Sequence, residues 1–198
     1  MDPTPGAGPR GPATPSSPDT VYERDIRTTV EAAGPDLLRV TARLHDDTYA
    51  DGGFQAIHDM TLVATVDLRT MEIVDVDASM ANSPHGTCPV TILDLRRVVG
   101  LRIAAGFFGE LRRRLGGPRS CNHLHTLTQQ VGTVVALSYA ALRTMRTPGL
   151  ADLGAEDFFG EILEAEPRVV NSCKIWAADG DLVARIRARN AARDQPAG

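Results

Sequence analysis

The chain has 198 residues, 42% of them hydrophobic, and a formal net charge of −4. Its basic residues are interleaved with acidic ones, so the sequence has no positively charged stripe that would fit a nucleic acid. No apolar stretch approaches the length of a membrane span, which argues against a membrane partner. Three cysteines cannot all pair and the N-terminus lacks the pattern of a secretory signal, so we expect a cytoplasmic protein.

The ends of the chain differ in composition from its middle. Residues 1–20 are rich in Pro, Gly and Ala. Such a segment buries too little apolar surface to offset the conformational entropy that it would lose on ordering. We therefore predict a disordered arm over 1–20, a single α+β domain over 21–190 and a flexible tail over 191–198.

The first half of the domain has the pattern of an antiparallel sheet. Alternation of Leu38, Val40, Ala42 and Leu44 is typical of a half-buried strand. Two further alternating runs are separated by the short loop Leu68-Arg69-Thr70, as in a hairpin. The predicted strands cover 25–32, 37–46, 57–67 and 71–78, giving a meander of three or four strands.

The second half has helical periodicity. Cys88 stands at a candidate N-cap before Pro89, and Gly100 ends the first helical segment. Apolar spacing predicts further helices over 101–115, 120–145 and 155–164, the second of these being the central helix. A strand is expected over 169–177, with Cys173 in the core beside Trp176, followed by a strand or helix over 182–186. The predicted fold is an α+β fold with an antiparallel sheet packed on one face by helices.

Cys121 and Cys88 are the leading candidates for metal ligands. Each lies at a predicted helix start, where the unsatisfied amides and the helix dipole favour a thiolate. Four-residue spacing places His125 on the same helix face as Cys121, and His123 joins them only if the first turn is irregular. A buried structural cysteine is the alternative for either position.

His58-Asp59 is the third candidate segment. Adjacent side chains of a strand point to opposite faces of the sheet, so only one of the two is expected at a given site, and we favour His58 as the ligand. Asp59 is then a fourth ligand, an acceptor that orients an imidazole, a general base or a plain surface residue. No phosphate-binding glycine loop, dinucleotide fingerprint or serine elbow is present in the sequence.

Four segments of the chain together carry a family resemblance. They are Ile57-His58-Asp59-Met60, Cys88-Pro89, Gly116-Gly117-Pro118-Arg119-Ser120-Cys121-Asn122-His123 and Asn171-Ser172-Cys173. In this order they resemble the landmarks of a bacterial family known as domain of unknown function 2889. The resemblance covers about 22–186, implies no established activity, and singles out His123 rather than His125.

The order of these segments is also distantly similar to that of the U-type iron-sulfur cluster assembly scaffolds. There a cysteine-glycine-aspartate element precedes two strands, a second cysteine opens a helix and a third opens a long helix. Here His58-Asp59 would replace the first element, with Cys88 and Cys121 as the second and third. An imidazole in place of a thiolate makes a bound divalent ion more Lewis-acidic, as in catalytic zinc sites.

These patterns predict a zinc or iron ion held by His58, Cys88, Cys121 and His125, with Asp59 or His123 moving a proton. The function expected is hydrolytic, hydration or lyase chemistry on a small carbonyl-containing metabolite. Alternatives are a noncatalytic metal or iron-sulfur carrier and a metal-free enzyme with Cys121 as nucleophile and a histidine as base. A small-molecule substrate is the expected partner, and the sequence leaves homo-oligomerisation open.

Overall fold

The computed structural model describes residues 17–50, 53–165 and 167–193; most of the predicted N-terminal arm and C-terminal tail lie outside them. Four long strands form one antiparallel meander in the order β1-β2-β3-β4. Their bounds are β1 (Tyr22–Ala32), β2 (Leu37–Ala50), β3 (Gly53–Asp67) and β4 (Glu72–Asn82). The predicted α+β class and antiparallel sheet are confirmed, although most of the strands extend further than their alternation alone indicated.

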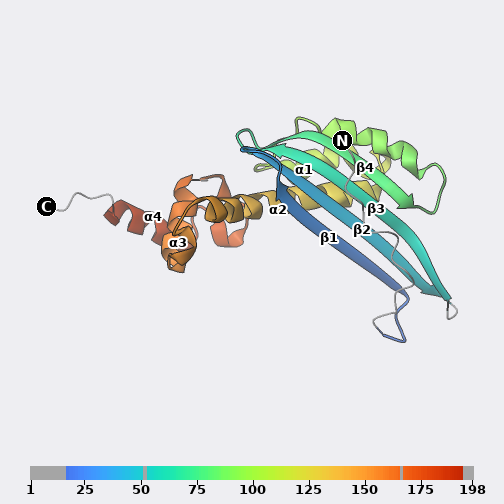
Figure 1. The fold of residues 1–198 in the computed structure, drawn as a ribbon, viewed down its shortest axis with the longest axis horizontal. Helices are drawn as coiled ribbons and strands as arrows, with labels where there is room; N and C mark the ends of the chain where they lie inside the picture. The colour runs from blue at the N-terminus through green and yellow to red at the C-terminus, as the bar shows by residue number, and fades with distance from the viewer. Residues whose placement is uncertain (1–16, 51–52, 166, 194–198) are drawn as a thin grey trace.

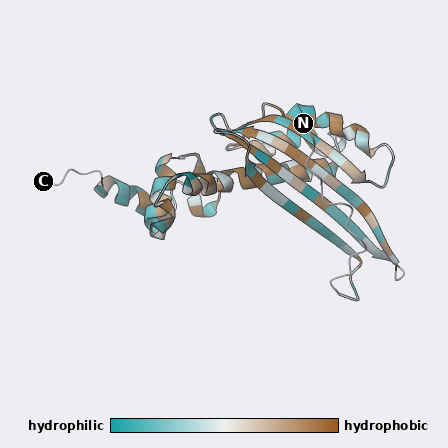
Figure 2. Ribbon diagram, viewed as in Figure 1, coloured by the Kyte–Doolittle hydropathy of each residue, from teal (hydrophilic) through white to brown (hydrophobic). Residues whose placement is uncertain are grey.

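Hydrophobic and hydrophilic residues alternate along the strands (Figure 2), and because successive side chains of a strand point to opposite sides, the sheet has one apolar and one polar face. On β2 the residues from Leu38 to Leu44 in steps of two are all buried, and the next residue in the same series is Asp46, which has no exposed surface. Leu44 pairs with Met60 and Asp46 with His58 across the β2–β3 ladder, and the register shifts immediately after Asp46. The apolar face therefore ends in a polar group at this end of the sheet.

Three helical elements cover the apolar face (Figure 1): the 3₁₀ helix η1 (Cys88–Val98), α1 (Phe107–Leu115) and α2 (Asn122–Arg146). Buried residues of the helical layer meet the sheet in one core, including Leu95, Val98, Phe107, Leu111, Leu124, Leu127 and Val131. None of the described helices has the length and apolar character needed to cross a bilayer.

The helix predicted over 101–115 starts later, at Phe107. Residues Leu101 and Ile103 instead extend the sheet edge: the Leu101 carbonyl accepts from Ile73 N at 3.1 Å, and Ile103 N donates to the Met71 carbonyl at 2.7 Å. Gly106 then adopts a left-handed φ of 89° at the N-cap of α1, a conformation that glycine tolerates. Backbone pairing with β4 thus overrides the helical spacing of 101–106.

The C-terminal half of α2 extends beyond the sheet (Figure 1). For this reason Met145, near the end of the helix, is 85% exposed. Past it lie η3 (Leu150–Asp152), α3 (Ala155–Ala165) and α4 (Asp181–Arg193), and α3 and α4 pack together through a small second cluster centred on Leu163, Val183 and Ile186.

Between α3 and α4 the structure corrects one prediction. The expected strand over 169–177 is absent from the described residues there, which form turns and the 3₁₀ helices η4 (Pro167–Val169) and η5 (Lys174–Trp176). All the strands of the described residues belong to the sheet β1-β2-β3-β4, and none of them pairs with this segment. Cys173 is exposed rather than part of the core.

Candidate metal site

Asp46, His58 and His123 converge beneath the polar end of the sheet's covered face. Each offers a ligand atom, and these three atoms lie within 4.8 Å of one another. His58 Nδ1 is 2.9 Å from Asp46 Oδ2, and His123 Nε2 is 3.8 Å from the same oxygen. The two imidazole rings are tilted by 39° with centroids 3.9 Å apart. Strands β2 and β3 supply the first two residues as a cross-strand pair, and α2 supplies the third.

Arg24 on β1 anchors the carboxylate of this cluster. Its Nε and Nη2 donate to the two oxygens of Asp46 at 2.6 and 2.7 Å, and Nη2 also donates to the Tyr22 hydroxyl at 3.0 Å. Burial of Asp46 opposes its ionisation, but hydrogen bonds from Arg24, Tyr22 and His58 outweigh burial and lower the pKa of Asp46 below its ordinary value. Asp46 is therefore a carboxylate at neutral pH.

Cys121 lies beside His123 through a local irregularity at the start of α2. Cys121 is the N-cap of the helix, with an extended ψ of 130°, so it precedes the helical turns rather than forming part of them. This conformation brings Cys121 Sγ to 3.6 Å from His123 Nδ1. The four-residue spacing that favoured His125 applies only within a regular helix, and His123 is consequently the histidine that joins the cluster.

His123 is held in an environment that favours its neutral form. Burial lowers its pKa, electrostatic interactions with His58 and Arg24 lower it further, and Asp46 opposes the shift. A neutral imidazole retains a lone pair for a metal ion or a proton. This protonation state suits either a ligand or a general base.

The other predicted residues are placed elsewhere in the described chain. Asp59 lies on the face of the sheet opposite His58, where it is buried and Arg43 Nη2 binds it at 2.9 Å. The pKa of His125 is lowered by burial and by Arg112 of α1, and its Nε2 is buried without a hydrogen-bond partner. Cys88 is the first residue of η1 and is partly buried. Neither Cys88 nor Cys121 belongs to the cluster of Asp46, His58 and His123, whose ligand atoms lie within 4.8 Å of one another.

Sequence reasoning missed Asp46 and Arg24. The signal for Asp46 was present, because this residue continues the inward series Leu38, Val40, Ala42, Leu44 by one more step. A carboxylate at a predicted core position requires a partner, and the cross-strand neighbour His58 and the β1 residue Arg24 provide it.

Comparison with protein families matches residues 22–137 to the family described as "Protein of unknown function (DUF2889)". The match covers more than half of the chain, and the protein belongs to this family. It spans the sheet, η1, α1 and the first part of α2, so both strands and the helix that form the cluster lie within it. Comparison with curated proteins and with solved structures gives no match.

Proposed function

We propose that this protein is a metal-dependent enzyme that binds a zinc or iron ion through Asp46, His58 and His123. We propose further that the ion drives hydrolytic, hydration or lyase chemistry on a small carbonyl-containing metabolite. The observation that carries the proposal is the convergence of three ligating side chains from three elements, two of them buried and one partly buried. Two imidazoles and one carboxylate form a ligand set that divalent zinc and iron accept.

The separations of these atoms support the proposal. Two ligands about 2.1 Å from one ion lie about 3 Å apart at a right angle and about 3.4 Å apart at the tetrahedral angle. The observed separations from Asp46 Oδ2 are 2.9 Å to His58 and 3.8 Å to His123. The His123–Asp46 separation exceeds the tetrahedral value by about 0.4 Å, and all three ligand atoms lie within 4.8 Å of one another, so binding of one ion requires the imidazoles to move inward.

The surroundings of the ligands supply what such a site needs. Arg24 keeps Asp46 ionised, and a bound ion would replace the His58 Nδ1 proton that now lies between His58 and Asp46 Oδ2. Because His123 directs Nε2 at Asp46 and Nδ1 at Cys121, the sulfur can accept the second ring proton and fix the tautomer that leaves Nε2 free. Three protein ligands would leave open positions for water or a carbonyl oxygen, which the ion would activate or polarise.

Metal analysis tests the proposal directly. Protein purified without a histidine tag is expected to hold close to one zinc or iron per chain, and His123→Ala to weaken metal binding by about 100-fold or more. The matched control is His85→Ala, since His85 is exposed and lies outside the cluster. Equal metal content in wild type and both variants would contradict the proposal.

A second candidate is a metal-free thiol enzyme in which Cys121 is the nucleophile and His123 its base. The 3.6 Å separation between the Cys121 sulfur and His123 Nδ1 favours it, as does the lowered pKa of that histidine. Alkylation of metal-free protein by iodoacetamide provides the test, with exposed Cys173 as an internal reference. This candidate requires Cys121 to react faster than Cys173 and the excess rate to vanish in His123→Ala; a slower Cys121 eliminates it.

A further inference from the structure

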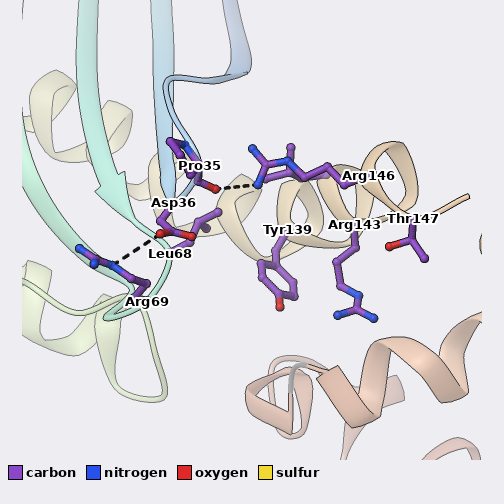
Figure 3. Close-up of a pocket in the computed structure, with 9 residues that line it drawn as sticks. Pro35, Asp36, Leu68, Arg69, Tyr139, Arg143, Arg146 and Thr147 are labelled. Atoms are coloured by element: carbon purple, nitrogen blue, oxygen red, sulfur yellow. Dashed lines mark hydrogen bonds and ion pairs between the residues drawn. The ribbon is translucent and has the colours of Figure 1, made fainter.

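A pocket of about 410 Å³ lies between the sheet and the far half of α2 (Figure 3). The turn before β2 and the turn after β3 form one wall, and the last turns of α2 form the other. The residues that matter for its chemistry are Leu68, Arg69, Tyr139, Leu142, Arg143 and Arg146. Apolar side chains and guanidinium groups therefore line the same space.

The charges of the pocket do not balance. Three arginines face one acid, Asp36, among the lining residues. Arg69 Nη2 forms an ion pair with Asp67 Oδ2 at 2.7 Å, and Arg69 Nε lies 3.9 Å from Asp36 Oδ2. Arg146 Nη1 donates to the Pro35 carbonyl at 2.6 Å. Asp67 therefore offsets the charge of Arg69, whereas Arg146 is anchored by a carbonyl and keeps its positive charge.

Arg143 forms neither an ion pair nor a side-chain hydrogen bond with the described residues. Its Nε is buried with no hydrogen-bond partner, and no described acid forms an ion pair with it. Because no described residue pairs with this guanidinium, its terminal nitrogens are left to receive an incoming oxygen anion in the pocket that Arg143 lines. Tyr139 precedes Arg143 by one helical turn, and the two side chains project from the same side of α2 (Figure 3).

We propose that this pocket binds a small organic anion, whose carboxylate or phosphate oxygens are received by Arg143. The planar guanidinium fork matches two oxygens of such a group, and the charge of Arg146 adds attraction. Leu68, Leu142 and the ring of Tyr139 form the surface against which an apolar body of the ligand packs.

The pocket is separate from the Asp46–His58–His123 cluster. It lies at the start of β2 and the end of β3, whereas the cluster lies at the opposite ends of the same strands. Along α2, Arg143 follows His123 by twenty residues, which is about 30 Å of helix. Anion binding here is therefore independent of the proposed metal site.

The test is a titration of the full-length, chelator-treated protein with inorganic phosphate, benzoate and the neutral analogue benzamide at constant ionic strength. Binding is followed through the Arg143 Nε–H resonance. We expect saturable binding of at least one anion, at least tenfold weaker binding of benzamide, and a loss of at least tenfold in Arg143→Gln. The His123→Ala variant is expected to bind as wild type does.

The matched control is Arg27→Gln, which removes an exposed arginine of β1 and should change affinity by less than twofold. Preference for benzoate would identify a carboxylate on an apolar body, and preference for phosphate a phosphate ester. Benzamide binding as tightly as benzoate, or equal anion affinity in wild type and Arg143→Gln, would overturn the proposal. An Nε–H resonance that does not move during the titration overturns it without reference to any variant.

Discussion

Asp46 and His58 meet as a direct cross-strand pair, with Asp46 Oδ2 2.9 Å from His58 Nδ1 beneath the helices that cover the sheet. Neighbouring pairs on this face, such as Leu44 with Met60, are apolar and buried. A buried polar pair at the end of an apolar ladder is unfavourable unless its members are hydrogen-bonded. The two hydrogen bonds that Arg24 donates to the Asp46 carboxylate meet this requirement.

Arg24→Gln is expected to destabilise the fold. The substitution leaves the fully buried Asp46 carboxylate without its counterion, a change that typically costs 3–5 kcal/mol. Because the Arg24 side chain is 34% exposed, we expect about 3 kcal/mol, at the lower end of that range. Urea unfolding measures the effect, and exposed Arg27→Gln serves as the control. Identical midpoints for the two variants would show that Asp46 does not depend on Arg24.

Asp67 is expected to make stability depend on pH through Arg69. Hydrogen bonds from the Arg69 side chain and backbone lower the pKa of Asp67 to about 2. Because the folded pKa lies below the ordinary value of 3.8, the stabilisation is present above about pH 4 and is lost as the pH falls towards 2. Urea unfolding should show Arg69→Gln less stable than wild type at pH 7 and nearly equal to it at pH 2. A stability difference that is constant between these pH values would contradict the assignment.

Gly132 is expected to be the point of closest approach between α2 and α1. A Cβ at this position would overlap the ring of the buried Phe107. Although alanine favours a helix by about 1 kcal/mol over glycine, overpacking costs about 1–3 kcal/mol, so Gly132→Ala should destabilise.

Gly109 in α1 is the matched control, because its Cβ would meet only the end of Arg113 at 3.9 Å. Thermal or urea unfolding should show Gly109→Ala neutral or stabilising and Gly132→Ala destabilising, with partial rescue of the latter by Phe107→Leu. A stabilising Gly132→Ala would mean that α1 packs elsewhere.

Cys121→Ser separates the role of the sulfur from that of the imidazole beside it. On the proposed function Cys121 orients His123 rather than binding the ion, so zinc affinity should fall by about 10- to 100-fold and remain measurable. Titration with zinc of chelator-treated protein gives the comparison. If the loss equals that of the His123→Ala, Asp46→Asn and His58→Ala variants, the sulfur is itself a ligand; if affinity is unchanged, the contact has no orienting role.

Much of the sheet was predictable because its apolar alternation is local in sequence. The phase of β3 also predicted correctly that His58 and Asp59 would face opposite sides of the sheet. The sequence did not reveal that residues 101–106 pair with β4, because that pairing depends on distant backbone groups. Nor did helical spacing reveal the His123 contact, which arises from the extended conformation of Cys121 at the N-cap.

The position of a bound metal ion in a crystal tests directly whether Asp46, His58 and His123 form a metal site. Crystals of the protein loaded with zinc or iron, measured at the absorption edge of that metal, should give one strong anomalous peak. This peak is expected within bonding distance of Asp46, His58 and His123. A peak at Cys88 or Cys173 instead, or none near the three side chains in a metal-loaded crystal, would contradict it.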